Sequence, residues 1–548
     1  MKRKYKPVLA VVVLIFLVAL IGTVSYIISK YTPTKEKMDL NSYYGEMADN
    51  EAAIVLGAEK LEQRGIVSGD RVYLPYDVVS QNLNQRYYWD AVSQQMLYAT
   101  PSELTYAPAS SEPDSDVWLR DGTIYLSLSY IQRYTDIDAY ISREPYRVAI
   151  QNHFNRVKTV KVKKQTYIRY QGGIKSPVLT EVAKGTVLRF VEEMEKWDKV
   201  ATDDGYIGYV EKKNLGDVEK TTFERDFQGE QYTRLTMEEP VNLVWHQVMS
   251  TDANNNFAYD TANITGVNVI SPTWFCLADN SGNITSIASA DYVNQAHEMG
   301  MKVWGLIDNF TQDVSTTDIL SDTSARQNVI GQLIQSACEV GLDGINVDFE
   351  ALSEDAGVHF LEFLRELCIE CHKNNLILSV DNPVPEDFTS HYNWAEQGKV
   401  ADYVIMMGYD EHYTGSDAGS VASLPWVEKG IQDMLEKIPA ERLISAVPFY
   451  TRLWKTSGDA VTSDAIGMNQ AQQIIADNQV DTYWDKNTSQ NYGTFEKDNT
   501  TYQIWLEDAQ SIAVRAKLVP KYKLAGIAEW KLGFENSSIW QVITDNIH

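Results

Sequence analysis

The sequence predicts an α/β protein whose largest part is a (β/α)8 TIM barrel with a small α+β insertion. Two observations predict this barrel: strand and helix signals alternate over residues 225–548, and eight of the strand signals are short buried runs. A third observation, a long apolar run near the N-terminus, predicts a transmembrane helix. Between that helix and the barrel, the patterns predict an α+β stalk domain and then a small β-barrel domain.

Residues 1–37 predict a basic cytoplasmic start followed by a membrane anchor. Residues 8–28 are apolar and uncharged, and 21 helical residues span roughly 31 Å, which matches a bilayer core. The preceding residues include four basic ones, Lys2, Arg3, Lys4 and Lys6. By the positive-inside rule we expect a single-pass protein with a cytoplasmic N-terminus and the remaining domains on the cell-wall side of the cell membrane. The run does not end in a small-residue cleavage site, so an uncleaved anchor is favoured over a signal peptide.

The charge of the chain excludes some classes of partner and site. Lys and Arg number 48 and Asp and Glu 75, giving a net charge of −27, and so acidic a surface repels nucleic acid. Four cysteines are too few for a disulfide scaffold in 548 residues. The sequence has neither an HExxH zinc motif nor a phosphate-binding GxxxxGK[ST] loop, and we expect no metal and no cofactor.

Residues 40–153 predict a domain of mixed helix and strand. Ile54, Leu56, Ala58 and Leu61 are spaced for one face of a helix over residues 50–64. Residues 72–79 predict a strand leading into a short helix, and residues 85–90 and 123–128 predict further strands. This arrangement resembles the stalk domain at the N-terminus of copper amine oxidases, although the sequence shows no His cluster for copper.

Residues 155–217 predict short strands with glycines at the corners, which is typical of a small barrel. The landmarks are Lys184-Gly185, Trp197, Gly205 and Gly208-Tyr209-Val210. Their order resembles the bacterial Src-homology-3-like domain. The resemblance implies a module that binds a cell-wall ligand.

The eight buried strands of the expected barrel are residues 240–245, 267–270, 302–307, 344–349, 376–380, 403–407, 443–447 and 526–530. In such a barrel the chemistry lies at the carboxyl ends of the strands. Residues 455–523, between the last two strands, are too many for one loop and helix, and two runs within them suggest a hairpin. We therefore expect an inserted subdomain there that forms one wall of the cleft.

The fourth strand reads Asp343-Gly-Ile-Asn-Val-Asp-Phe-Glu350, in which apolar and polar residues alternate. Because helices cover the outer face of a parallel barrel, Asn346, Asp348 and Glu350 should point inward, with Glu350 at the mouth. Two carboxylates two residues apart lie about 6.5–7 Å apart between Cα atoms, so crowding and burial should raise one pKa and leave the other group ionised. That pair suits a general acid above an electrostatic stabiliser. An exposed antiparallel strand or a metal site would also show polar alternation, but the eightfold count favours the barrel.

The octapeptide resembles the signature DGxDxDxE of family-18 glycoside hydrolases, with matches at Asp343, Gly344, Asp348 and Glu350. Asn346 stands where the family usually has Asp, and members of its spore-wall and peptidoglycan N-acetylglucosaminidase branch often have the same Asn. Three other segments agree with the chitinase-like family: Met407-Gly-Tyr409-Asp410 with MxYD, Pro448-Phe-Tyr450-Thr-Arg452 with PFYxR, and Trp530 at the end of the eighth strand. The resemblance covers residues from about 235 to 548.

The resemblance implies a retaining, substrate-assisted mechanism at N-acetylglucosamine. Glu350 would protonate the glycosidic oxygen, and Asp348 would stabilise the acetamido group while that group attacks the anomeric carbon. Tyr409 would hydrogen-bond the acetamido oxygen, with Asp343 and Asn346 completing the catalytic signature. The substrate-binding residues would be Met407, Asp410, Trp530, Tyr450 and Arg452.

Together these predictions describe a monomeric, membrane-anchored glycoside hydrolase that cleaves β-1,4 linkages in peptidoglycan. A chitinase or chitooligosaccharide hydrolase is the first alternative, because chitin offers the same sugar and linkage. A non-catalytic, lectin-like wall binder on the same barrel is the second. Tethering favours peptidoglycan, and the presence of both Asp348 and Glu350 favours an enzyme over a binder.

Overall fold

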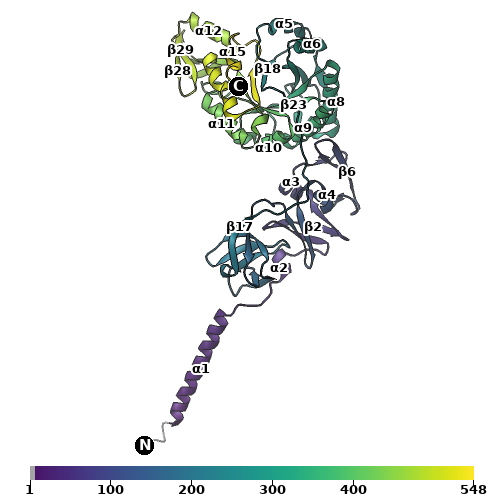
Figure 1. Ribbon diagram of the computed structural model, residues 1–548, viewed down its shortest axis with the longest axis vertical. Coiled ribbons are helices and arrows are strands. Elements are labelled where there is room, and N and C mark those ends of the chain that lie inside the picture. Colours follow the sequence, from purple (N-terminus) through teal and green to yellow (C-terminus); the bar gives the residue numbers. More distant parts are fainter. Residues whose placement is uncertain (1–5) are drawn as a thin grey trace. The chain divides into compact units, whose positions relative to one another are not determined.

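The computed structural model describes residues 6–548 and begins with an apolar helix. Helix α1, Lys6–Tyr31, exposes its apolar side chains from Val8 onward (Figure 1). It is long and apolar enough to cross a membrane, a property that signal sequences share. Lys2, Arg3 and Lys4, on which the predicted orientation depends, lie outside the described residues.

The rest of the chain divides into two compact units. One comprises residues up to Tyr87 together with Ala107–Gly229, and the other comprises Tyr88–Tyr106 and Glu230–His548. The elements of the first part of the first unit are α2 (Leu40–Tyr44), β1 (Glu51–Leu56), β2 (Glu59–Ser68), β3 (Arg71–Pro75), α3 (Tyr76–Asn82), β7 (Val117–Arg120), β8 (Thr123–Ser127), α4 (Leu128–Tyr134), β9 (Asp138–Arg143) and β10 (Tyr146–Gln151). Its strands lie in the order β7-β8-β3-β2-β1-β10-β9.

The helix predicted over residues 50–64 is wrong. The segment forms β1 and β2, an antiparallel hairpin whose turn contains Gly57 at φ +59°. The run from Ala52 to Val55 is buried along its whole length because β1 is an inner strand that also pairs with β10. A continuous apolar run suits both a helix face and a buried strand, and the pairing partners decided between them.

A seven-stranded antiparallel sheet completes the first unit. Its elements are β11 (Val157–Val162), β12 (Thr166–Arg169), β13 (Val178–Val182), β14 (Val187–Glu193), β15 (Trp197–Ala201), β16 (Ile207–Glu211), the short helix η1 (Lys212–Asn214) and β17 (Leu215–Thr221). The strand order is β13-β12-β16-β15-β14-β11-β17. Val160, Leu188, Val200 and Val210 point into its core and are buried. The sheet lies where the sequence predicted a small β-domain.

The second unit contains a closed barrel of eight parallel strands, which confirms the predicted fold. The strands are β18 (Val241–His246), β19 (Val269–Leu277), β21 (Lys302–Asp308), β22 (Gly344–Asp348), β23 (Ile377–Pro383), β24 (Tyr403–Met407), β25 (Leu443–Pro448) and β31 (Gly526–Trp530). They follow one another around the barrel, and β18 pairs with both β19 and β31 to close it. The short β20 (Ile284–Ser286) adds an antiparallel edge to β19.

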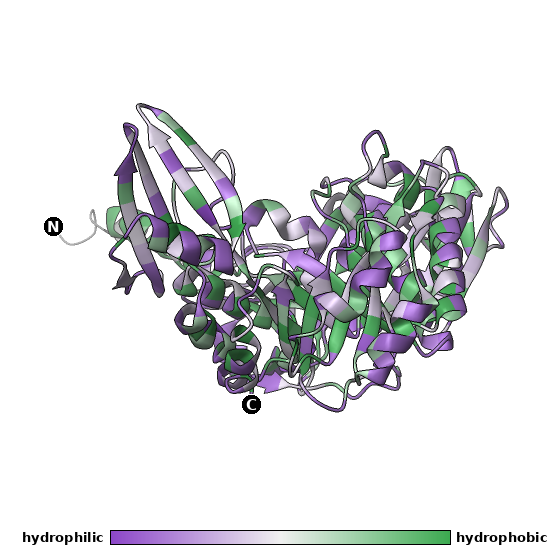
Figure 2. Ribbon diagram, turned by 90° about the horizontal axis from the view of Figure 1, so that it is seen from above, coloured by the Kyte–Doolittle hydropathy of each residue, from purple (hydrophilic) through white to green (hydrophobic). Residues whose placement is uncertain are grey.

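Helices surround the barrel and connect its strands. They are η2 (Asp252–Asn256), α5 (Phe257–Asp260), α6 (Ala290–Glu298), α7 (Thr316–Ser321), α8 (Thr323–Val340), α9 (Ala356–Lys373), η3 (Asp387–Tyr392), α10 (Trp394–Val400), α11 (Leu424–Leu435), η4 (Ala440–Arg442), α13 (Ala509–Ala516), α14 (Leu518–Tyr522) and α15 (Ile539–Thr544). Along these helices hydrophobic and hydrophilic segments alternate (Figure 2), as expected when one face of each is buried.

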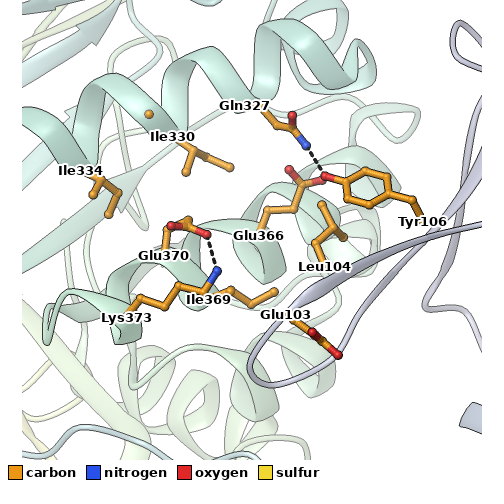
Figure 3. A pocket seen from close by; sticks show the side chains of 11 residues that line it. Glu103, Leu104, Tyr106, Gln327, Ile330, Ile334, Glu366, Ile369, Glu370 and Lys373 are labelled. Carbon is orange, nitrogen blue, oxygen red and sulfur yellow. Dashed lines mark hydrogen bonds and ion pairs between the residues drawn. The ribbon is translucent and has the colours of Figure 1, made fainter.

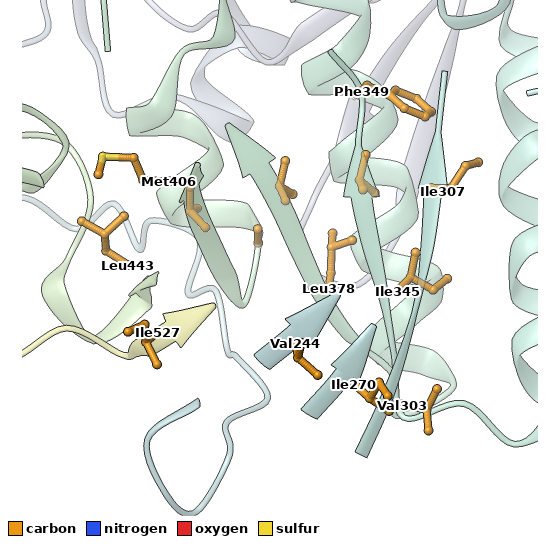
Figure 4. Packing of buried hydrophobic residues seen from close by; sticks show 14 of the residues in the cluster. Val244, Ile270, Val303, Ile307, Ile345, Phe349, Leu378, Met406, Leu443 and Ile527 are labelled. Atoms are coloured by element: carbon orange, nitrogen blue, oxygen red, sulfur yellow. The ribbon is translucent and has the colours of Figure 1, made fainter. Parts of the chain in front are cut away.

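Each barrel strand divides its side chains between two apolar layers. Outward-facing residues such as Val303, Ile345 and Leu378 form the layer under the helices (Figure 4). Inward-facing residues such as Leu243, Trp304 and Ile405 fill the barrel interior. Polar inward residues such as Asn346 and Ser379 are also buried in this interior, where they hydrogen-bond to one another.

The expected insertion is present between β25 and β31. It is a five-stranded sheet with one helix: β26 (Tyr450–Ser457), β27 (Ala460–Gly467), α12 (Met468–Asp477), β28 (Tyr483–Asp485), β29 (Gln490–Lys497) and β30 (Thr500–Leu506). It begins at Tyr450, earlier than the predicted residue 455, and α13 and α14 then return the chain to the barrel.

A hairpin from the predicted stalk region belongs to the barrel unit. It comprises β4 (Tyr87–Asp90), β5 (Gln95–Ala99) and the start of β6 (Leu104–Ser110). The Tyr88 hydroxyl lies 2.7 Å from His359 Nδ1 and accepts from Arg326 Nη1 at 3.3 Å, and Arg326 is in turn paired with Glu366 at 2.7 Å. The hairpin is therefore anchored on α8 and α9 through a buried ion pair.

Candidate active site

The fourth barrel strand, β22, has the predicted alternation of faces. Ile345, Val347 and Phe349 pack in the outer layer, where the Phe349 ring stacks on Phe363 of α9 at 5.4 Å. Asn346 is fully buried in the barrel interior, and Asp348 follows it on the same face with 5% of its surface exposed. The strand thus carries its polar side chains inward, toward the mouth of the barrel.

A cavity of about 190 Å³ opens at the carboxyl ends of the barrel strands. Its lining residues are Trp245, Phe310, Asp348, Glu350, Asp381, Met407, Tyr409, Asp410, Tyr450 and Trp530. They include seven of the predicted site residues. Asp343, Asn346 and Arg452 are not among them.

Asp343 lies before the amino end of β22, away from the cavity. Its carboxylate accepts hydrogen bonds from Lys302 Nζ at 2.8 Å and from the backbone N–H of Val303 at 2.9 Å, and it lies 2.7 Å from His297 Nε2. These contacts join β22 to β21 and α6. The structure therefore places Asp343 in a stabilising ion-pair cluster, not among the groups that face a substrate.

Asn346 lies beneath the cavity and makes four hydrogen bonds. Its Oδ1 accepts from Trp245 Nε1 at 2.9 Å and from Ser271 Oγ at 3.3 Å. Its Nδ2 donates to Ser379 Oγ at 3.0 Å and to Asp381 Oδ1 at 2.9 Å. The amide satisfies its full hydrogen-bonding capacity and connects β18, β19, β22 and β23.

Asp381, on β23, is a site residue that the sequence reasoning missed. It is 2% exposed and lines the cavity beside Asp348. A signal was present: Leu378 and Val380 alternate with Ser379 and Asp381 on the fifth strand, as on the fourth. Burial raises the pKa of Asp381 well above its usual value, although the hydrogen bond from Asn346 opposes this shift.

The two predicted carboxyl groups both have raised pKa values. Burial raises the pKa of Asp348 well above its usual value, and the charges of Asp381, Glu350 and Asp308 add to the effect. Desolvation by the cavity walls raises the pKa of Glu350, which the charges of Asp410 and Asp308 raise further. A raised pKa keeps Glu350 protonated closer to neutral pH, as a proton donor requires.

Asn309 fixes the backbone of Glu350 and was also missed. Its Oδ1 accepts from the Glu350 N–H at 3.0 Å, and its Nδ2 donates to the Glu350 carbonyl oxygen at 3.0 Å. A third bond at 3.0 Å, from Nδ2 to Thr316 Oγ1, fixes the amide itself. The residue that follows, Ala351, has φ +51°, so the strand turns sharply directly after Glu350.

The MxYD and PFYxR segments meet on one side of the cavity. Tyr450 donates its hydroxyl hydrogen to Asp410 Oδ1 at 2.5 Å, and Arg452 Nη2 lies 3.9 Å from the same oxygen. The rings of Tyr409 and Tyr450 meet edge to face at 6.1 Å. Arg452 donates to Thr414 Oγ1 at 2.7 Å and so supports Asp410 from outside the cavity.

Aromatic rings form the remaining walls. Trp530 and Trp245 meet edge to face with 5.9 Å between their centroids, and Trp245 is buried while Trp530 is half-buried. Phe310, in the loop after β21, is 56% exposed at the cavity mouth and was not predicted. Such flat apolar surfaces suit the faces of pyranose rings. In residues 6–548 no group of three or more His, Cys, Asp or Glu side chains is arranged to hold a metal ion.

A second hollow, of about 440 Å³, lies on the outside of the barrel unit (Figure 3). Isoleucines of α8 and α9 line it together with Leu104, Tyr106, Glu366 and Gln327, and Gln327 Nε2 donates to the Tyr106 hydroxyl at 3.0 Å. It contains none of the predicted site residues. Two of its carboxylates are paired: Glu370 with Lys373 at 2.9 Å and Glu366 with Arg326 at 2.7 Å.

Comparison with known proteins agrees with the geometry. The family model described as glycosyl hydrolases family 18 matches residues 241–535, and the model described as bacterial SH3 domain matches residues 164–216. The uncharacterized glycosylase YvbX of Bacillus subtilis is 27% identical over 292 residues, which are 51% of this chain and 84% of that protein.

Two further proteins extend the comparison. The cortical fragment-lytic enzyme of B. subtilis is 25% identical over 240 residues, which cover 42% of this chain but only 56% of that enzyme. In structure, the C-terminal domain of a putative chitinase from Desulfitobacterium hafniense matches with a TM-score of 0.53 at 18% identity, over 57% of this chain and all of that domain. The structural match supports the barrel fold.

Proposed function

Because the chain belongs to glycosyl hydrolase family 18 and is a glycoside hydrolase, we propose that it cleaves β-1,4 linkages at N-acetylglucosamine in peptidoglycan. One observation carries the proposal: Glu350 and Asp348 line a single cavity together with the aromatic rings of Trp245, Trp530 and Phe310. A sugar that rests on these rings presents its glycosidic bond to the carboxyl groups.

In the proposed reaction Glu350 is the general acid. It donates its proton to the glycosidic oxygen, the bond between that oxygen and the anomeric carbon breaks, and the acetamido oxygen of the same sugar bonds to this carbon. Water then opens the resulting oxazolinium ring with net retention of configuration, and Glu350 recovers a proton from that water. The raised pKa of Glu350 supports the first step.

The other cavity residues orient the sugar. Asp348 accepts the acetamido N–H and stabilises the positive charge that develops on this group. The Tyr409 hydroxyl donates to the acetamido oxygen, and Asp410, held by Tyr450, contacts the sugar beside it. Trp530 packs against the apolar face of the pyranose, and Met407 packs beneath it.

The choice of peptidoglycan depends on the rest of the chain and on its relatives. A cortical fragment-lytic enzyme is among the relatives, and an apolar N-terminal helix and an SH3-like domain precede the barrel. We infer that α1 anchors the protein in the cell membrane with the barrel on the wall side. Chitin is the second candidate substrate, because a human di-N-acetylchitobiase is also similar, at 25% identity over 288 residues.

The proposal is tested by digesting purified peptidoglycan and chitin side by side with the full-length protein and analysing the products by mass spectrometry. Glu350→Gln should lose activity by about 10²–10⁴-fold, because the amide has no proton to donate. Glu354→Gln, the same change at an exposed neighbour, should retain it. Products from chitin alone would favour the second candidate, and binding without cleavage of either polymer would favour a lectin-like binder.

The anchor is tested separately by membrane fractionation. Full-length protein should remain in the membrane fraction after alkaline extraction, and a variant that begins at residue 38 should be released. Release of the full-length protein would refute the anchor, and its shortening to the size of the variant would show that residues 1–37 act as a cleaved signal sequence.

A further inference from the structure

We propose that Asp381 is the positioning partner of Asp348, and that the two side chains share one proton across neighbouring strands while Asn346 holds Asp381 in place. The inference deepens the proposed function and rests on it, because it assigns how Asp348 is kept ready for the sugar. Neither the octapeptide on β22 nor the MxYD segment contains Asp381, which comes from a strand of its own.

The register of the sheet places the two carboxyl groups side by side. Asn346 and Val347 of β22 pair with Ser379 and Val380 of β23, and continuing this register by one residue sets Asp348 opposite Asp381. Neighbouring strands lie about 4.8 Å apart, and both side chains face the cavity.

Each carboxyl group has one buried oxygen that lacks a hydrogen-bond partner. These oxygens are Asp348 Oδ1 and Asp381 Oδ2, in side chains that are 5% and 2% exposed. Two neighbouring carboxylates in so dry a place cannot both be ionised. A single proton between these oxygens satisfies both, because one group then donates to the other.

Asn346 determines which oxygen of Asp381 is available. Its Nδ2 donates to Asp381 Oδ1 at 2.9 Å, which leaves Oδ2 free to face Asp348. The same hydrogen bond favours an ionised Asp381, so before the sugar reacts the proton lies on Asp348. An aspartate at position 346 would have no such proton to donate when ionised, and an amide serves this role at any pH.

The proton moves when the sugar reacts. As positive charge develops on the acetamido group, the O–H bond of Asp348 Oδ1 breaks and an O–H bond forms at Asp381 Oδ2. The pair has one negative charge before and after this transfer, and no proton leaves it. Asp348 is thereby ionised at the moment when its charge stabilises the intermediate.

Several other titratable groups surround the pair. They are Asp308 at the end of β21, Glu350 after β22, Tyr392 of η3, Tyr409 and Asp410 after β24, and Tyr450 of β26. None of these is cationic, and Arg452 is paired with Asp410. These residues supply no cation to balance two carboxylates, so a shared proton is what lowers the negative charge of Asp348 and Asp381.

The test compares Asp381→Asn, Asp381→Ala and the control Glu366→Gln in the full-length protein. The control makes the same acid-to-amide change at a buried carboxyl group of α9, outside the cavity. Asp381→Asn keeps a polar neighbour for Asp348 but removes the second acid. Asp381→Ala removes both and should lower kcat by about 10²-fold with little change in KM, since it releases Asp348 from its position.

The decisive readout is pH dependence. A carboxyl pair titrates in two steps, one with a pKa below and one with a pKa above that of a single carboxyl group. The lower step sets the acid limb of kcat in the parent. Asp381→Asn leaves a single group and should therefore move this limb to higher pH by about one unit or more. In infrared difference spectra the protonated-carboxyl band of the parent should persist to higher pH than that of Asp381→Asn. The control should retain the acid limb of the parent.

Two results would overturn the inference: an unchanged acid limb in both Asp381 variants, or an equal shift in Glu366→Gln. An unchanged infrared titration in Asp381→Asn would also refute it. This spectrum requires no turnover, so it distinguishes failure of the inference from failure of the proposed function, in which the parent protein cleaves neither polymer.

Discussion

Replacing Asn309 by alanine tests whether hydrogen bonds to the backbone of Glu350 hold this residue in position as the acid. The substitution removes two hydrogen bonds to Glu350, one from its N–H and one to its carbonyl oxygen, both 3.0 Å long. The Asn309 side chain does not line the cavity, so substrate contacts remain. We expect kcat to fall while KM changes little, because only the position of the proton donor is disturbed.

The magnitude follows from these two bonds. At about 0.5–1.5 kcal/mol net each, their loss amounts to about 1–3 kcal/mol. If all of this free energy is added to the activation barrier, kcat falls roughly 5- to 150-fold, since 1.36 kcal/mol is tenfold in rate. Water at the exposed rim replaces part of each bond, so we expect the lower part of this range, about 5- to 30-fold.

The assay measures kcat and KM on soluble glycan oligomers together with the melting temperature. Asn328→Ala is a matched control: on α8, outside the cavity, it removes two hydrogen bonds of 3.1 and 3.2 Å to Ser281 and Asn283. If Asn309→Ala keeps the kcat of the parent and only loses stability, as the control does, then Asn309 does not position the acid and the reasoning fails.

Four further outcomes are expected. Trp530→Ala should raise KM about tenfold, with a smaller rise in Trp530→Phe, if the ring stacks on the sugar as we propose; equal KM values would contradict this role. Asp410→Asn should move the basic limb of kcat/KM to lower pH, since the negative charge of Asp410 raises the pKa of Glu350, and a shift to higher pH would refute that electrostatic reading. Tyr88→Phe should lower the unfolding free energy by about 1–2 kcal/mol in a denaturant titration but leave kcat unchanged, because it removes only the hydroxyl contacts to α7, α8 and α9. Burial raises the pKa of Glu366 from 4.5 to about 7, so the stability that its proton contributes is present below pH 4.5 and is lost as pH rises through 7. The melting temperature of the parent should therefore fall relative to that of Glu366→Gln between these pH values. A difference in melting temperature that does not change with pH would argue against the raised pKa.

Much of the fold could be predicted because its signals are local. Each barrel strand is a short apolar run, and the eight runs recur with helices between them. The alternation in β22 placed Asn346 and Asp348 on the inner face before any partner was known. The segment at residues 50–64 shows the limit, since its apolar spacing suited a helix and its pairing with β10 made it a strand.

The site was predicted less completely, because it is assembled from separate strands. Asp343 was grouped with Asp348 by sequence, yet five strand residues extend about 16 Å and place it at the other end of β22. Asn346 and Asp381 are 35 residues apart in sequence and 2.9 Å apart in space. Asn309 and Phe310 likewise reach the site from the loop after β21.

The sequence alone predicted Glu350 as the acid, and it determined the faces of the strand that precedes Glu350 and the apolar N-terminal helix. Each of these depends on residues that are close together along the chain. The tertiary structure alone decided which groups surround that acid. Closure of the barrel brings the ends of eight strands together, and only then do Asp381, Asn346 and Asn309 acquire their hydrogen-bond partners and the carboxyl groups their mutual repulsion. Hydrogen bonds and charge interactions act over a few ångströms of space, whatever the separation along the chain.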